Sequence, residues 1–270
     1  PCGEPTIDEA HARYEAYLRY YILGLRHAAS PYAYHSIGSC IATVPRAYAT
    51  VRGVPKRQAG EDFYLLNKLA KVGRIHHADS SPVAIVARAS LRVPFGTGRA
   101  THDIAKNVEG YRIYDPKVFE LLKSWLSALE ACDEAPAERA YEEVYERAGE
   151  ALDPSDHARL GTALLAIGAP EALVRAAAHT HSVPDRRKRL RDWFDAFRTL
   201  KLVHALRDGG LVDVPWREAI AAAPFCRSTA DAEEAAERTA GVPVEAGGAR
   251  SFQTCRRLAI LEEHGPQRAS

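Results

Sequence analysis

The hydrophobic pattern of this 270-residue chain changes its period near residues 103–114. Before that interval, helical spacing alternates with short apolar runs typical of buried strands, at residues 39–44 and 82–88. After it, helix start and stop signals recur, and no segment has a convincing strand pattern. We therefore predict an α/β part over residues 1–103, followed by an all-α part of about six or seven helices over residues 104–270.

Helix caps and periodicity define the expected elements. Thr6-x-x-Glu9 has the form of a capping box, and the apolar spacing after it predicts a helix ending near His27. A short helix should run from Pro45 through Tyr48, and a further helix should be opened by Glu61 and Asp62 and closed by Gly73. In the second part the helix start signals are Asp115-Pro116, Asp153-Pro154 and Ser228-x-x-Asp231, and the expected helix ends are Gly168, Gly209 and Gly265.

Composition restricts the compartment and the partners. The formal net charge is +1, which gives no overall field that would favour nucleic acid. The five cysteines are dispersed without a C-x-x-C pair, which predicts reduced thiols and a cytoplasmic protein. No apolar run approaches the roughly 20 residues that a spanning helix needs. The chain contains no methionine, even at position 1, so we expect the sequence to begin inside a longer protein.

Glu61 and Asp62 form an acidic pair at a predicted helix start, and two interpretations are open. Carboxylates at this position are stabilised by the exposed N–H groups and the helix dipole, which makes helix capping the ordinary reading of an isolated pair. The functional reading is a general base that takes a proton from a hydroxyl nucleophile.

The segments around this pair occur in a characteristic order. A small-residue loop with Gly38 and Ser39 leads into a strand, a short helix follows, and a glycine turn brings the chain to Glu61-Asp62 and an apolar helix. Over residues 30–103 this succession resembles the acceptor half of the family 2 glycosyltransferases, which have the Rossmann-like GT-A fold. The family often has a further acidic residue and an arginine after the pair, where this chain has Phe63-Tyr64 and Asn67-Lys68.

The resemblance implies an inverting transfer of a sugar from a nucleotide-sugar donor to an acceptor that the sequence does not identify. Asp62 would be the base and Glu61 an acceptor contact, with Gly38 and Ser39 in the substrate-binding loop. Such enzymes bind Mg²⁺ or Mn²⁺ through an Asp-x-Asp motif in an N-terminal nucleotide-binding half. No Asp-x-Asp occurs in this chain. We therefore expect that half to lie upstream, and the chain alone to be inactive.

Arg88, Arg92 and Arg99 surround the sequence Gly96-Thr97-Gly98. These arginines are candidate phosphate ligands, with the glycines bringing backbone N–H groups close to the same oxygens. The alternative is a basic surface loop with a glycine turn. His76 and His102 are candidate metal ligands, because several GT-A enzymes complete their metal shell with a histidine beyond the base. Neighbouring residues on a strand face opposite ways, so His77 should not share a metal with His76.

The helical part carries an acidic run over residues 133–150 and a basic run over residues 186–201. The ordinary reading is two solvated helix faces that meet each other, with Trp193, Phe194 and Phe197 in the core. The basic run could instead hold the protein peripherally on the cytoplasmic face of a membrane. The alternative to an enzyme is a non-catalytic helical scaffold or binding module with a degenerate α/β segment.

Overall fold

A computed structural model describes residues 2–132, 136–180, 182–226 and 255–263, without the side chains of residues 39, 78–82, 84 and 255–263. The described chain is mainly α-helical, in agreement with the helical part of the prediction. The α-helices are α1 Pro5–His27, α2 Pro45–Thr50, α3 Glu61–Leu69, α4 Thr97–Ala105, α5 Lys117–Glu130, α6 Ala140–Gly149, α7 Pro154–Ala166, α8 Ala169–Ala178, α9 Val183–Trp193, α10 Ala196–Asp208 and α11 Trp216–Ala222. The strands are β1 Ile41–Ala42, β2 Gly73–Ala84, β3 Arg112–Ile113, β4 Val214–Pro215 and β5 Cys255–Glu263.

The chain forms two compact units, and each is assembled from separate stretches of sequence. The first unit comprises Pro1–Ile22, Tyr34–Tyr111 and Phe225–Ser270, of which the described residues are those given above. The second comprises Leu23–Ala33 and Arg112–Pro224. The passage from Tyr111 to Arg112 lies inside the interval where the hydrophobic period changes.

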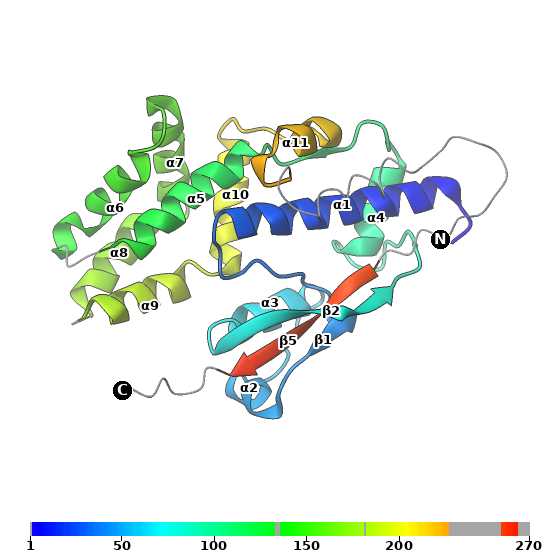
Figure 1. The fold of residues 1–270 in the computed structure, drawn as a ribbon, viewed down its shortest axis with the longest axis horizontal. Coiled ribbons are helices and arrows are strands. Elements are labelled where there is room, and N and C mark those ends of the chain that lie inside the picture. The colour runs from blue at the N-terminus through cyan, green and yellow to red at the C-terminus, as the bar shows by residue number, and fades with distance from the viewer. Residues whose placement is uncertain (1, 133–135, 181, 227–254, 264–270) are drawn as a thin grey trace. The chain divides into compact units, whose positions relative to one another are not determined.

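A three-stranded mixed sheet with the order β1-β5-β2 lies in the first unit (Figure 1). β5 runs parallel to β1, with Ile41 opposite Ala259, and antiparallel to β2, with Ile75 opposite Leu261. The register of β2 and β5 shifts between Ala78 and Val83. The expectation of no strand after residue 115 is therefore wrong. The short apolar run of residues 258–261 fits a strand as well as a helix, because periodicity does not separate the two over four residues.

α3 packs beside this sheet through its apolar face. Leu65, Leu66 and Leu69 are buried, as the helical spacing predicted. The helix ends at Leu69, and Gly73 begins β2 instead of closing the helix. The predicted strand over residues 82–88 is therefore displaced: β2 begins nine residues earlier and ends at Ala84. The strand that was expected at residues 39–44 is only two residues long, after a 3-10 turn at Gly38–Cys40.

α1 has its predicted extent, but its N-terminus is not capped by Thr6 and Glu9. The Asp8 carboxylate instead accepts hydrogen bonds from the backbone N–H groups of Cys2 at 2.7 Å and Gly3 at 3.3 Å. Glu9 pairs with Arg13 one turn later. The helix begins at Pro5, one residue before the predicted cap, so Thr6 already lies within the first turn.

The second unit has a helical core formed by the apolar faces of α5, α7, α8 and α10. Val118, Phe119 and Trp125 on α5 are fully buried, as are Leu160 and Leu164 on α7 and Leu202 and Val203 on α10. Asp153 caps α7 by accepting from the N–H groups of Ser155 and Asp156, with Pro154 in the first turn, as predicted. Asp115 accepts from the Lys117 N–H at 2.8 Å, although α5 begins only at Lys117.

Gly168 separates α7 from α8 with a φ of 76°, and Gly209 follows α10, so both predicted helix ends are confirmed. The start expected at Ser228 and the end expected at Gly265 lie outside the described residues. β3 and β4 pair antiparallel in a two-stranded ribbon, the second place where a strand occurs in the region predicted to be all-helical.

Candidate functional site

Asp62 lies in the first turn of α3. Gly60 precedes the helix with a φ of 74°, a left-handed conformation that glycine adopts without the steric cost other residues bear. One Asp62 carboxylate oxygen accepts a hydrogen bond from the Phe63 N–H at 2.7 Å. Asp62 therefore satisfies one of the backbone donors that the helix start leaves open, as the capping interpretation predicted.

The same carboxylate is half-buried against the loop that carries Gly38. A Cβ built on Gly38 would lie 3.4 Å from both Cβ and Oδ2 of Asp62, and the Gly38 N–H is a further hydrogen-bond donor to it. Burial raises the pKa of Asp62 above its ordinary value, and the charge of Glu61 raises it further, while the N–H groups of Phe63 and Gly38 lower it. The structure thus brings together Asp62 and Gly38, two residues predicted to share a site.

Glu61 is exposed at the start of the same helix. Ser39 lies in the Gly38–Cys40 turn, and its side chain is outside the description. Tyr64 lies on α3, and the guanidinium of Arg57, from the loop before the helix, stacks over its ring, with Cζ 3.7 Å from the ring centre. This cation–π pair was not predicted, because Arg57 belongs to a loop whose path the sequence pattern does not fix.

Of the three predicted phosphate ligands, Arg88 and Arg92 are exposed. Arg99 lies on α4, where its Nε is 2.6 Å from Asp103 Oδ2, so this guanidinium is already paired within the helix. The preceding loop is closed by the Ser90 N–H, which donates to the Gly98 carbonyl at 2.9 Å. α4 was not predicted, because Gly98 and the polar residues of the helix give a weak helical signal. Phosphate binding by Arg88 and Arg92 stays a prediction.

The histidines are dispersed over two elements. His76 and His77 lie on β2, and the His77 ring meets the His35 ring edge-on at 5.7 Å. His102 lies on α4, with Nδ1 3.1 Å from Asp103 Oδ1. Among the residues that the structure describes, no group of three or more His, Cys, Asp and Glu side chains is placed to hold a metal ion. The ligand set proposed from His76 and His102 stays a prediction.

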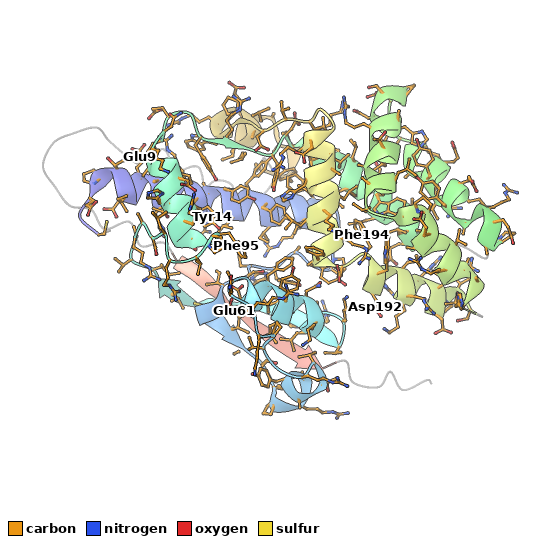
Figure 2. All side chains as sticks on the ribbon, turned by 180° about the vertical axis from the view of Figure 1, so that it is seen from behind. Glu9, Tyr14, Glu61, Phe95, Asp192 and Phe194 are labelled. Carbon is orange, nitrogen blue, oxygen red and sulfur yellow. The ribbon has the colours of Figure 1, made fainter. Side chains whose placement is uncertain are left out.

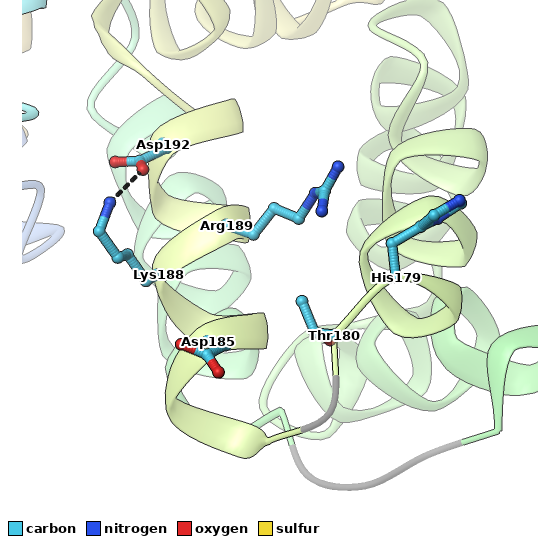
Figure 3. Close-up of a pocket in the computed structure, with 6 residues that line it drawn as sticks. All are labelled: His179, Thr180, Asp185, Lys188, Arg189 and Asp192. Atoms are coloured by element: carbon cyan, nitrogen blue, oxygen red, sulfur yellow. Dashed lines mark hydrogen bonds and ion pairs between the residues drawn. The ribbon is translucent and has the colours of Figure 1, made fainter.

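A polar cavity of about 330 Å³ lies between the end of α8 and one face of α9 in the second unit (Figure 3). Lys188 and Asp192 pair at 2.6 Å along its rim, and Arg189 projects into the space between the two helices. The sequence marked the basic run here but not the cavity, which depends on the turn between α8 and α9. The lining residues are His179, Thr180, Asp185, Lys188, Arg189 and Asp192.

Several cationic side chains of the basic run form hydrogen bonds or ion pairs within the second unit. The Arg187 guanidinium donates to the Cys132 carbonyl at 3.2 Å, and Arg191 lies 3.7 Å from Glu130 on α5. Phe194 is buried, as predicted, whereas Trp193 and Phe197 are half-buried. Arg198 lies over the Trp193 ring, and Lys201 lies over the Phe197 ring. Peripheral membrane binding by this run stays a prediction.

No protein-family model, curated protein or solved structure matches the chain.

In the described part of the chain, no single helix has both the length and the apolar composition to cross a membrane. The bent pair of α7 and α8 meets the two criteria only when its helices are taken together. Among the described cysteines, Cys2, Cys40, Cys132 and Cys226 are not joined by a disulfide bond.

Proposed function

We propose that this chain forms the acceptor side of an inverting glycosyltransferase that uses a nucleotide-sugar donor, with Asp62 as the general base. The observation that carries the proposal is the position of Asp62. It is half-buried at a helix start, against the backbone of Gly38, and its pKa is raised chiefly by burial. A partial GT-A arrangement is part of the proposal. It is supported by the succession of the 3-10 turn, β1, α2 and α3 in the order on which the resemblance rests.

The raised pKa favours this role because a base gains proton affinity as its pKa approaches the pH at which it works. In the proposed reaction, the acceptor hydroxyl gives its proton to Asp62 as its oxygen forms a bond to the anomeric carbon. The bond from that carbon to the diphosphate oxygen breaks, and the nucleoside diphosphate leaves with the electron pair. Attack opposite to the leaving group inverts the configuration at the anomeric carbon.

Glu61 is proposed as an acceptor contact, because it is exposed and directly precedes the base. Arg88 and Arg92 are proposed phosphate contacts, since both are exposed on the segment between β2 and α4. The described residues do not form a metal shell, so no step of the reaction is assigned to a metal bound by them. The proposal therefore assigns the main Mg²⁺ or Mn²⁺ motif and the nucleoside contacts to residues outside those described, with Arg88 and Arg92 on the phosphates and His76 and His102 as predicted additional metal ligands.

The test is a screen of the natural gene product with UDP-, GDP-, dTDP- and CMP-linked sugars, with and without Mg²⁺ or Mn²⁺. Release of the nucleotide and donor binding by calorimetry are measured in parallel. The proposal predicts that one donor binds and is turned over. Absence of binding and turnover with every donor would contradict it.

That negative result would favour the alternative, a non-catalytic binding module. The separate helical core of the second unit, in which Trp125 and Leu202 are fully buried, is the observation that supports this alternative.

A further inference from the structure

Phe95 is an exposed aromatic side chain placed against the start of α3. The residue is 54% exposed, although burying a phenyl ring is favourable by ~2 kcal/mol. A Cβ built on Gly60 would lie 3.1 Å from Cε2 of Phe95 and 3.4 Å from Cζ. The absence of a side chain at Gly60 therefore lets the ring approach the backbone from which Glu61 and Asp62 project. Figure 2 shows Phe95 and Glu61 in the first unit.

The segment that carries Phe95 is anchored on both sides. The Ser90 N–H donates to the Gly98 carbonyl at 2.9 Å and closes the loop before α4. Gly96 has a φ of 104°, and its carbonyl accepts the Ala100 N–H at 2.9 Å, the first turn of α4. Because these two hydrogen bonds fix the backbone around Phe95, little backbone freedom is lost when a ligand packs on the ring, which favours binding.

The Phe95 ring lies beside Gly60, and the acidic pair follows Gly60 directly in the chain, so two kinds of surface adjoin the start of α3. The ring offers an apolar face, while Glu61 and Asp62 offer hydrogen-bond acceptors one and two residues beyond Gly60. A pyranose has a face formed by C–H groups and an edge formed by hydroxyl groups, so it can meet both surfaces at once. Binding sites commonly combine aromatic lining with a few polar groups that fix the orientation.

We infer that Phe95 is the platform for the acceptor, and that the acceptor is a carbohydrate. The apolar face of its sugar ring packs on Phe95, while one of its hydroxyl groups points to Asp62. This inference rests on the proposed function, because it names the acceptor class of that site. An acceptor recognised through a phosphate would depend on Arg88 and Arg92 instead.

The experiment measures ligand binding in the Asp62→Asn variant by saturation-transfer NMR, so that binding is read without turnover. The probes are the methyl pyranosides of glucose, mannose, galactose and N-acetylglucosamine, with farnesyl phosphate as the phosphate-bearing comparison. Phe95→Ala, Phe95→Leu and Phe95→Trp are compared in this background. Leu91→Ala is the matched control, because Leu91 is 60% exposed on the same loop.

At least one methyl pyranoside is expected to bind. Phe95→Ala and Phe95→Leu should weaken it about tenfold, equivalent to ~1.4 kcal/mol, while Phe95→Trp and Leu91→Ala retain it. The inference is overturned if no pyranoside binds, if Phe95→Ala leaves binding unchanged, or if only farnesyl phosphate binds. Thermal melting of each variant checks that the exposed substitution leaves the fold intact.

If the natural protein turns over a nucleotide sugar but Phe95→Ala leaves the KM for the acceptor unchanged, the platform is wrong and the reaction stands. If a pyranoside binds through Phe95 but no nucleotide sugar is bound or turned over, the reaction is wrong. The platform is then a carbohydrate-binding surface without transfer.

Discussion

Asp156 joins three helices of the second unit through one buried carboxylate. Its side chain is 3% exposed, and its two oxygens lie 2.5 Å from Lys117 Nζ and 2.8 Å from Arg159 Nη1. Arg159 also donates to the Gly209 carbonyl at 3.2 Å, so the cluster links α5, α7 and the end of α10. Substituting Asp156 with alanine should therefore loosen the packing of all three helices.

The expected cost follows from burial. Removing one partner of a buried ion pair costs ~3–5 kcal/mol, chiefly because the other charge is left without solvent or partner. Lys117 and Arg159 are 46% and 28% exposed, so both cations keep access to water when the carboxylate is removed. Neither cation is left buried, so we expect Asp156→Ala to lower the free energy of unfolding by about 2 kcal/mol, the size of a lost hydrogen bond to a charged group and below that range.

Asp192→Ala provides the matched control. The Lys188–Asp192 pair has nearly the same separation, 2.6 Å, but its side chains are 64% and 38% exposed. Exposed pairs contribute ~0.5 kcal/mol, so this variant should be almost as stable as the wild type. Urea denaturation followed by circular dichroism measures both variants. If the free energies of unfolding of Asp156→Ala and Asp192→Ala differ by less than about 1 kcal/mol, burial does not determine the strength of the Asp156 cluster.

Three further predictions concern the first unit and the passage of α1 into the second. Asp62→Asn should make the protein more stable at pH 7. Burial raises the pKa of Asp62 in the folded state above its ordinary value of 3.8. The wild type therefore loses stability relative to the variant as the pH rises from 3.8 through the folded-state pKa. Urea titrations from pH 3.5 to 7 measure this, and an equal difference at every pH would refute it. Gly60→Ala should cost about 1–2 kcal/mol, because its φ is 74°, whereas Gly60→Asn should cost less; equal costs in denaturant titrations would count against backbone strain. Gly24→Ala should cost about 1–3 kcal/mol, because its Cβ would lie 2.5 Å from the Phe119 ring, and Phe119→Leu should relieve part of this cost in a double-mutant cycle.

The helical elements were predicted best where local signals fix them. Asp153 followed by Pro154 defines the start of α7, because the side chain and the fixed φ of proline act on the adjacent backbone. Gly168 likewise ends α7, since it adopts the left-handed conformation without steric cost. The apolar face of α3 followed from spacing alone, because Leu65 and Leu66 precede Leu69 by four and three residues on one side of a helix.

The sheet was predicted poorly because pairing between distant segments decides it. β5 lies more than 200 residues after β1 in sequence, and no local signal indicates that Ile41 and Ala259 are partners. β2 begins at Gly73, where a glycine after a helix reads as a helix end. Within the candidate site, the contact between Asp62 and Gly38 was expected only from the ordered motifs, and the placement of Phe95 on Gly60 was not expected.

The most direct test of the account compares wild type and Asp62→Asn in the natural gene product, using the donor that the nucleotide-sugar screen identifies. Loss of a general base should lower kcat by ~10²–10⁴-fold, while the Kd for the donor, measured by calorimetry, stays the same. The variant should also be at least as stable as the wild type at pH 7, so the loss cannot be assigned to unfolding. Turnover within about tenfold of wild type would contradict the assignment of Asp62 as the base.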